Sequence, residues 1–152
     1  MPGETIRLLF VCSGNTCRSP MAAAIAEHFA RARRADLPAI EVDSAGTGVS
    51  EGAPVTPEAA RALARLGVDA VAHRSRSLSR AQIDASDAIY CMTPAHLEAV
   101  LALAPDAAYK ARLLDPAGGS VPDPIGGSQR LYNDVCRTLA DLIAARMQEL
   151  DG

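Results

Sequence analysis

A nucleophile and an oxyanion-binding side chain stand close together near the start of the chain. The segment Cys12-Ser13-Gly14-Asn15-Thr16-Cys17-Arg18-Ser19 has the pattern of a cysteine, five intervening residues, an arginine and a serine. A cysteine thiolate is a nucleophile, and an arginine guanidinium can hold two oxygens of a tetrahedral oxyanion at once. The types of these residues and their spacing therefore indicate nucleophilic attack on a group such as a phosphoryl group.

The residues between Cys12 and Arg18 suit a binding loop. A loop of this length can turn its backbone N–H groups inward, and a helix that starts behind it adds positive potential. We therefore expect the pKa of Cys12 to lie below the ~8.5 of a free cysteine, with Ser19 donating a hydrogen bond to the sulfur. Gly14 permits a turn that a Cβ would obstruct, and Asn15 is expected to bond the loop backbone.

Other interpretations of this segment fit less well. A cysteine at the end of a strand is often only a small buried hydrophobe, but the complete pattern favours chemistry. The segment is not a Walker loop, because no Gly-Lys-Ser/Thr follows it. It is not a dinucleotide fingerprint either, because G-x-G-x-x-G is absent.

A thiolate that attacks phosphorus needs an acid to protonate the departing atom. Asp115 and Asp123 are both candidates, since each precedes a proline in a Pro- and Gly-rich stretch. Proline biases the preceding residue toward an extended backbone. Asp123 has prolines on both sides, which favours it only slightly, and an ordinary Asp-Pro turn stays open for both.

The elements around the loop alternate between strand and helix. Apolar, β-rich runs predict strands over 6–11, 40–42, 87–92 and 111–114. Prolines and N-capping threonines predict helices over 21–34, 57–66, 94–104 and 129–150, and a short helix follows the polar stretch 73–79. This alternation predicts one α/β domain over residues 1–152, with a short parallel sheet.

Composition excludes several classes of protein. The chain has 152 residues, of which 49% are apolar and 22% charged, and a formal charge of −3, so a nucleic-acid-binding surface is not expected. The longest apolar stretch, 99–105, is too short for a membrane span, and the first residues lack a basic signal-peptide region. Four cysteines without C-x2-C spacing exclude a disulfide scaffold and a structural zinc site. We expect a cytoplasmic protein.

These residues resemble the low-molecular-weight protein tyrosine phosphatase family over essentially the whole chain. The resemblance includes the Cys12–Ser19 loop continuing as Pro20-Met21-Ala22, the Ser44-Ala45-Gly46-Thr47 stretch, and Val121-Pro122-Asp123-Pro124 before the last helix. It implies a three-layer α/β fold in which a four-stranded parallel sheet is flanked by helices. It implies no metal and no organic cofactor.

The resemblance also implies a role for each site residue. Cys12 would form a phosphocysteine, Arg18 would bind phosphate, and Asp123 rather than Asp115 would be the general acid. Ser44 would join Asn15 in supporting the loop. The remaining loop residues would bind the oxyanion of a phosphorylated protein: Ser13, Gly14, Thr16, Cys17 and Ser19, together with Asn15 itself.

Two positions depart from the tyrosine phosphatases of this family and bear on the substrate. Those enzymes commonly carry aromatic residues just after the Asp-Pro, where this chain has Ile125 and Gly126, and a bulky aliphatic residue at the position of Thr16. Thr16 and the run after Asp123 are similar to the protein arginine phosphatase branch. We therefore favour phosphoarginine, with phosphotyrosine as the alternative.

Two further functions stay open. Arsenate reductases of this architecture pass electrons through further cysteines, and Cys91 lies in the right general region, but Cys136 is far from it in sequence. A module that only binds phosphate would need neither a nucleophile nor an acid. We expect Cys91 and Cys136 to be core residues.

Three smaller expectations concern side chains near or outside the loop. Cys17 is expected to form a reversible disulfide with Cys12 and to protect it from over-oxidation. The three histidines have no evident partner in the sequence and are expected at the surface: His28, His73 and His96. The basic cluster of Arg74, Arg76 and Arg80 is interpreted as a solvated face.

Overall fold

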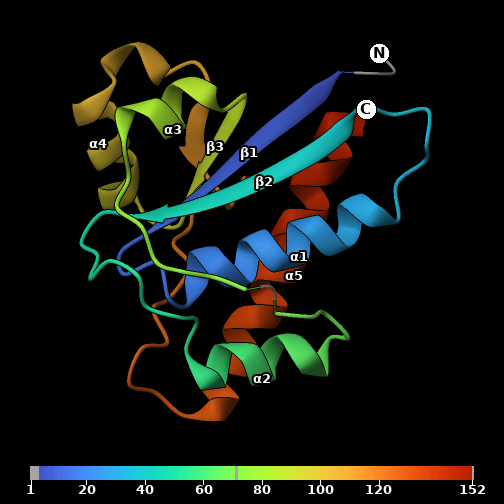
Figure 1. The fold of residues 1–152 in the computed structure, drawn as a ribbon, viewed down its shortest axis with the longest axis vertical. Coiled ribbons are helices and arrows are strands. Elements are labelled where there is room, and N and C mark those ends of the chain that lie inside the picture. Colours follow the sequence, from blue (N-terminus) through green and yellow to red (C-terminus); the bar gives the residue numbers. More distant parts are fainter. Residues whose placement is uncertain (1–3, 71, 152) are drawn as a thin grey trace.

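Four parallel strands form the centre of the protein. In a computed structural model, residues 4–70 and 72–151 are described, with the strands β1 (Thr5–Cys12), β2 (Ala39–Gly46), β3 (Ala88–Cys91) and β4 (Ala111–Leu113). Their order in the sheet is β2-β1-β3-β4, and every pair is parallel (Figure 1). The predicted four-stranded parallel sheet is confirmed.

The central strand β1 is buried on both faces. Residues 8–12 are at most 2% exposed, as expected for a strand inside a parallel sheet. Because side chains alternate along a strand, Leu8, Phe10 and Cys12 belong to one hydrophobic core, whereas Leu9 and Val11 belong to the other. The sequence of β1 therefore supplies both cores of the fold.

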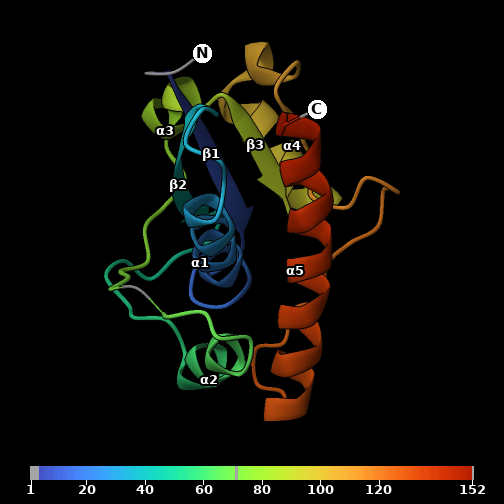
Figure 2. The ribbon, with the colours of Figure 1, turned by 90° about the vertical axis from the view of Figure 1, so that its right-hand side faces the viewer.

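Helices cover the two faces of the sheet. The helices α1 (Arg18–Arg31), α2 (Pro57–Arg65) and α5 (Gln129–Asp151) contribute to the core of Phe10, and Figure 2 shows α5 running along most of the molecule beside α1. On the other face, α3 (Arg80–Ala85), α4 (Pro94–Leu103) and the 3-10 helix η1 (Pro105–Ala107) enclose the core of Leu9. The architecture is the predicted three-layer α/β fold.

Capping residues explain where most helices begin. Thr56 accepts a hydrogen bond from the backbone N–H of Ala59 at 3.3 Å, and Pro57 opens α2 as predicted. α1 is an exception: it begins at Arg18, three residues before the predicted start. Cys17 occupies its N-cap position without a side-chain hydrogen bond, so the sequence carries no capping signal there.

The chain topology places the end of β1 at a functional position. β2 lies on one side of β1 and β3 on the other, so the connections diverge at the carboxyl end of β1, where open α/β sheets bind ligands. Cys12 is the last residue of that strand. Among the described residues, no helix combines the length and the apolar character needed to cross a membrane.

Candidate active site

The loop that follows β1 has its carbonyl groups turned outward. Five of its carbonyl oxygens accept hydrogen bonds. Four accept from distant segments: Cys12 from Thr47 N (3.0 Å), Ser13 from Gly48 N (3.0 Å), Asn15 from His73 Nε2 (2.7 Å) and Thr16 from Thr56 N (3.1 Å). The fifth, Cys17, accepts from Met21 N (3.0 Å) in the first turn of α1. In a trans peptide the next N–H points the opposite way. The backbone N–H groups of residues 13, 14, 16, 17 and 18 are therefore directed into the loop.

Asn15 holds this loop in shape. It has a φ of 56°, in the left-handed region that asparagine tolerates better than most residues. Its Nδ2 donates to Ser19 Oγ (2.7 Å) and to Ser44 Oγ (3.0 Å), and its Oδ1 accepts from Arg76 N (2.9 Å). The structure thus brings together Asn15 and Ser44, as the resemblance implied.

Cys12 lies at the base of the loop, and its sulfur is buried. The side chain is 2% exposed, and its Sγ is 2.8 Å from Ser19 Oγ. Burial, the largest influence, raises the pKa of the thiol, while hydrogen bonds from Ser19 and Asn15 and the charge of Arg18 lower it. The net direction is upward, so the expected low pKa was wrong: the prediction counted the positive groups and left out desolvation.

Arg18 connects the loop to the Asp123 segment. Its guanidinium is nearly buried and donates through Nη1 to Val121 O (2.9 Å). Its Nη2 lies 3.4 Å from both Ser13 Oγ and Asp123 Oδ2. Asp123 itself is partly exposed, and its Oδ1 accepts from Ile125 N at 3.1 Å. A carboxyl therefore lies beside the oxyanion-binding arginine, open to solvent and substrate.

These groups line a single pocket of about 250 Å³. Its lining consists of Cys12, Ser13, Gly14, Thr16, Cys17, Arg18, Gly48, Asp123 and Ile125. Asp115 is not among them, and its Oδ1 accepts from Ala117 N in a turn of its own. The pocket thus combines a nucleophilic sulfur, inward N–H groups, a guanidinium and a carboxyl, which is the set that phosphoryl transfer to sulfur requires.

The other three cysteines have different surroundings. Cys17 is 5% exposed, and its Sγ lies 3.4 Å from Tyr132 Oη and 3.7 Å from Thr56 Oγ1. Cys91 and Cys136 are fully buried, and burial raises their pKa values to about 12 and about 11. Both belong to the hydrophobic cores, as expected, and neither lines the pocket, which argues against a thiol relay of the arsenate-reductase kind.

Two histidines lie inside the protein, contrary to the expectation of surface positions. His73 is half-buried and donates to the Asn15 carbonyl, and His96 is 4% exposed with its Nε2 2.9 Å from Ser13 Oγ. His28 is exposed as expected. The sequence holds one signal for His96, since it stands three residues after Thr93, at the position that completes a capping box.

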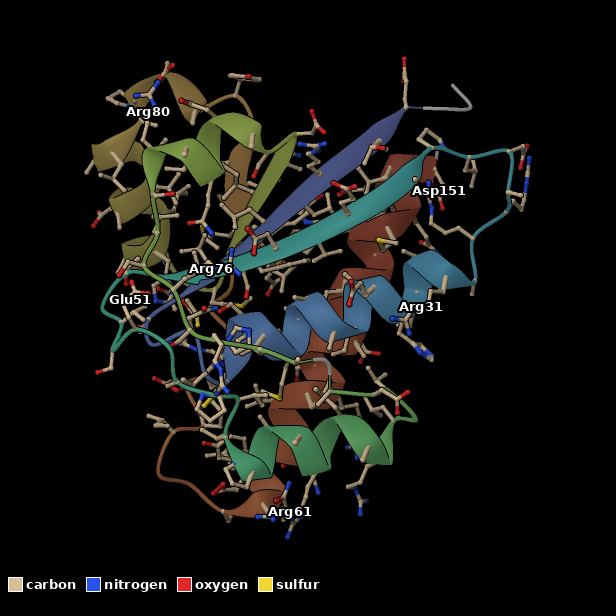
Figure 3. All side chains as sticks on the ribbon, in the orientation of Figure 1. Arg31, Glu51, Arg61, Arg76, Arg80 and Asp151 are labelled. Atoms are coloured by element: carbon tan, nitrogen blue, oxygen red, sulfur yellow. The ribbon has the colours of Figure 1, made fainter. Side chains whose placement is uncertain are left out.

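The arginines after His73 do not form one basic cluster. Arg76 lies 3.6 Å from Asp43, and Arg80 pairs with Asp84 and Asp106. Figure 3 shows Arg76 near the end of β2 and Arg80 at the start of α3. These side chains are exposed and paired with acids, in agreement with a solvated face.

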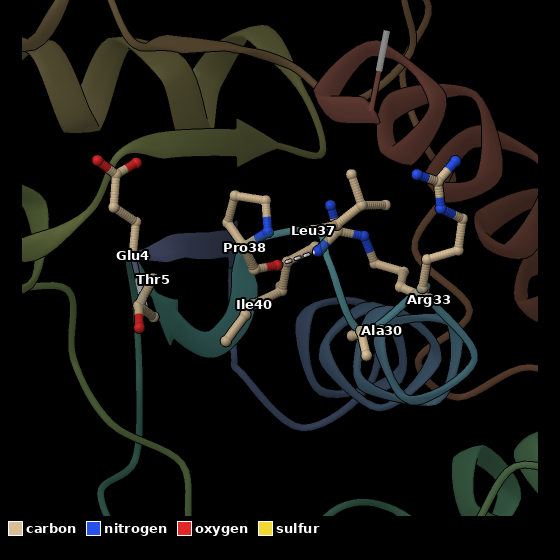
Figure 4. A pocket seen from close by; sticks show the side chains of 10 residues that line it. Glu4, Thr5, Ala30, Arg33, Leu37, Pro38 and Ile40 are labelled. Carbon is tan, nitrogen blue, oxygen red and sulfur yellow. Dashed lines mark hydrogen bonds between the residues drawn. The ribbon is translucent and has the colours of Figure 1, made fainter. Parts of the chain in front are cut away.

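A larger hollow of about 350 Å³ lies elsewhere, beside the start of β2 (Figure 4). Two arginines line it. Arg33 donates to the Pro38 carbonyl and pairs with Asp151, and Arg34 pairs with Asp36, so both charges are already engaged. The hollow contains no nucleophile. Within residues 4–70 and 72–151, no group of three His, Cys, Asp or Glu side chains is placed to hold a metal ion.

Known proteins resemble this chain in sequence and in structure. A protein-arginine-phosphatase of Geobacillus stearothermophilus is 37% identical over 149 residues, which cover 93% of this chain and 96% of the relative. A low molecular weight protein-tyrosine-phosphatase of Streptomyces coelicolor is 38% identical over 167 residues, covering 97% and 98%. A mutant of the YwlE arginine phosphatase with a phosphorylated active-site serine superposes with a TM-score of 0.88 at 31% identity, covering 96% of each chain.

A family model extends these pairwise similarities over nearly the whole sequence. The model described as low molecular weight phosphotyrosine protein phosphatase matches residues 7–152, which include the loop, the Asp123 segment and all four strands but the first two residues of β1. The chain belongs to the low molecular weight phosphotyrosine protein phosphatase family.

Proposed function

We propose that this phosphatase removes phosphoryl groups from arginine side chains of proteins, through a covalent phosphocysteine at Cys12. The observation that carries the proposal is the single pocket that holds the Cys12 sulfur, the Arg18 guanidinium and the Asp123 carboxyl. In the first step, the Cys12 thiol passes its proton to a phosphoryl oxygen, and its sulfur forms a bond to phosphorus as the bond to the substrate nitrogen breaks. Asp123 donates its proton to that nitrogen.

In the second step, water attacks the phosphocysteine. Asp123, now a carboxylate, takes a proton from the water as the new P–O bond forms, and the P–S bond breaks to return the thiolate and release phosphate. The inward N–H groups and Arg18 stabilise the charge on the phosphoryl oxygens in both steps. Ser19 lies within hydrogen-bond distance of the sulfur, which favours the thiolate as nucleophile and as leaving group.

The choice of phosphoarginine depends on the rim of the pocket. Thr16 places a small side chain with a hydroxyl there, which leaves room for a planar guanidino group and offers it an acceptor. Ile125, 58% exposed, stands where an aromatic side chain would stack on a phenol ring. The relative that is named a protein-arginine-phosphatase supports this substrate.

Phosphotyrosine stays the second candidate, because a relative named a protein-tyrosine-phosphatase is 38% identical over 97% of this chain. Phosphate release from matched phosphoarginine and phosphotyrosine peptides decides between the two, with Cys12→Ser as the blank. We expect a preference for phosphoarginine that falls at least about tenfold in Thr16→Ile, the cost of one lost polar contact.

Thr138→Ile on the exposed face of α5 is the matched control and should leave the preference for phosphoarginine over phosphotyrosine unchanged. A preference for phosphotyrosine in the wild-type protein would overturn the substrate assignment while leaving the cysteine mechanism intact. Release from neither peptide would contradict the proposed protein substrate.

We also propose that the chain is a single phosphatase domain that acts in the cytoplasm. The described helices pack on one sheet, which supports a single domain. The four cysteines are free thiols, the state that a reducing compartment maintains.

A further inference from the structure

One polar contact at the pocket has no part in the chemistry assigned to Cys12, Arg18 and Asp123. His96, at the start of α4, is 4% exposed, and its Nε2 lies 2.9 Å from the hydroxyl of Ser13. The two residues are 83 positions apart in sequence. Ser13 follows the nucleophile directly and is one of the residues that line the pocket.

The hydrogen bonds of the imidazole define which nitrogen carries the proton. Nδ1 of His96 lies 3.1 Å from Thr93 Oγ1, which can donate or accept, and 3.2 Å from the backbone nitrogen of Thr93, whose N–H can only donate. Nδ1 is therefore an acceptor without a proton, and the neutral ring carries its proton on Nε2. Burial and the charge of Arg18 lower the pKa of His96 to about 4, while the charge of Asp123 raises it, so the ring is neutral near pH 7.

The protonated Nε2 determines what Ser13 can do. A serine hydroxyl has two lone pairs and one proton. Nε2–H of His96 donates to Ser13 Oγ, and Arg18 Nη2 donates to the same oxygen at 3.4 Å. Both lone pairs then face donors, and the hydroxyl proton is left for an acceptor in the pocket.

We propose that His96 is a positioning residue that makes the Ser13 hydroxyl a donor to a phosphoryl oxygen. The loop binds the oxyanion through backbone N–H groups and Arg18, and Ser13 adds one oriented side-chain donor to this set. Without His96, the hydroxyl is free to rotate and to accept from a second Arg18 N–H, which would turn its proton away from the oxyanion. His96 thus acts through Ser13 and touches no reacting atom.

A double-mutant cycle between His96 and Ser13 tests this inference. His96→Asn keeps an acceptor that can reach the Thr93 N–H, but its side chain is too short to reach Ser13. His96→Gln is long enough to place an amide N–H near the position of Nε2. Each variant is made in the wild-type background and with Ser13→Ala, and thermal unfolding reports whether it is folded.

The readout is binding of inorganic phosphate, measured as protection of Cys12 from alkylation by iodoacetamide. We expect about tenfold weaker protection in His96→Asn and in Ser13→Ala, the loss expected for one hydrogen bond to a charged oxygen. The double variant should lose no more than either single variant, and His96→Gln should recover part of the affinity. The inference would be overturned if His96→Asn weakened phosphate binding as much in the Ser13→Ala background as in the wild-type background. Unchanged phosphate binding in His96→Asn would overturn it as well.

The inference rests on phosphoryl binding at the proposed site but not on turnover. A wild-type protein that releases phosphate from neither peptide, yet shows the expected cycle in phosphate protection, would support the role of His96 and contradict the proposed substrate. If His96→Asn does not fold, the comparison of His96→Gln with Ser13→Ala carries the test. Equal phosphate affinity of wild type and Ser13→Ala would then overturn the inference.

Discussion

At Cys12, burial and hydrogen bonding act in opposite directions on one sulfur atom. Burial raises the pKa of the thiol, and Ser19, 2.8 Å away, lowers it. Removing the hydroxyl in Ser19→Ala should therefore raise the pKa further. We expect the pH midpoint of iodoacetamide alkylation to move upward by about one pH unit, the effect of losing one hydrogen bond to a charged group.

Mass spectrometry of the alkylated protein across a pH series measures this midpoint. Ser120→Ala, on an exposed loop, makes the same chemical change away from the sulfur and serves as the control. An unchanged midpoint in Ser19→Ala would show that the contact does not stabilise the thiolate.

The second thiol of the loop has its own prediction. Cys17 Sγ contacts Tyr132 and Thr56, and both Cys12 and Cys17 line the pocket. After mild peroxide treatment, we expect a Cys12–Cys17 disulfide and full recovery of activity on reduction. Cys17→Ser removes the resolving thiol, so Cys12 should advance to sulfinic acid, and activity should not return. Intact-mass and peptide analysis would refute the protective role by finding sulfinic acid at Cys12 in the wild type without a disulfide.

At the scale of elements, the end of β2 and the Cys12–Ser19 loop pack so closely that only glycine fits at position 46. A Cβ on Gly46 would overlap the Ser13 carbonyl oxygen and Val49 Cγ2. Gly46→Ala should lower the free energy of unfolding by about 1 to 3 kcal/mol. It should also displace the loop, with about a hundredfold loss of kcat/KM.

Thermal unfolding and phosphate release measure the two effects together. In Gly48→Ala the added Cβ meets no atom within 4 Å, so the melting temperature of this control should stay close to that of wild type. Equal melting temperatures for Gly46→Ala and wild type would contradict the steric argument.

Most elements could be predicted because their boundaries carry local signals. Thr56-Pro57 and Thr93-Pro94 mark the starts of α2 and α4, and the apolar run before Cys12 marks β1. The predicted start of α1 was three residues too late, because its N-cap residue, Cys17, has no side-chain oxygen to cap the helix. Local chemistry therefore predicts a boundary only where a side chain satisfies the helix end.

The site was only partly predictable for a related reason. The nucleophile Cys12 and Arg18 lie close together in the sequence, so a short motif is enough to identify them. His73 and His96 reach the loop from 58 and 83 residues away, and no local pattern records such a contact. The predicted lowering of the Cys12 pKa was also wrong, because desolvation depends on how the surrounding residues pack, and a sequence motif does not record that packing.

At the scale of the whole molecule, one buried histidine couples stability to pH. The pKa of His96 is about 4 in the folded protein, below its ordinary 6.5. Between these values the unfolded chain binds more protons than the folded one, so stability falls as pH falls from about 6.5 toward 4. We expect this group to lower the free energy of unfolding by about 2 kcal/mol between pH 7 and pH 5.

Urea unfolding at the two pH values measures the decrease, and the same pair of measurements on His96→Gln isolates the histidine. The variant should lose about 2 kcal/mol less than wild type over this interval. Equal losses in the two proteins would assign the pH dependence to other groups.

The outward carbonyls of the loop also have a consequence for how the enzyme is made. The nucleophile and arginine are synthesised before the groups on which they depend: the donors that orient the loop include Thr47, Thr56 and His73, and the acid comes from residue 123. A growing chain therefore carries the reactive cysteine well before it can bind or cleave a phosphoryl group. Catalytic competence arrives only once residues as far as Asp123 have been synthesised and have folded against the loop.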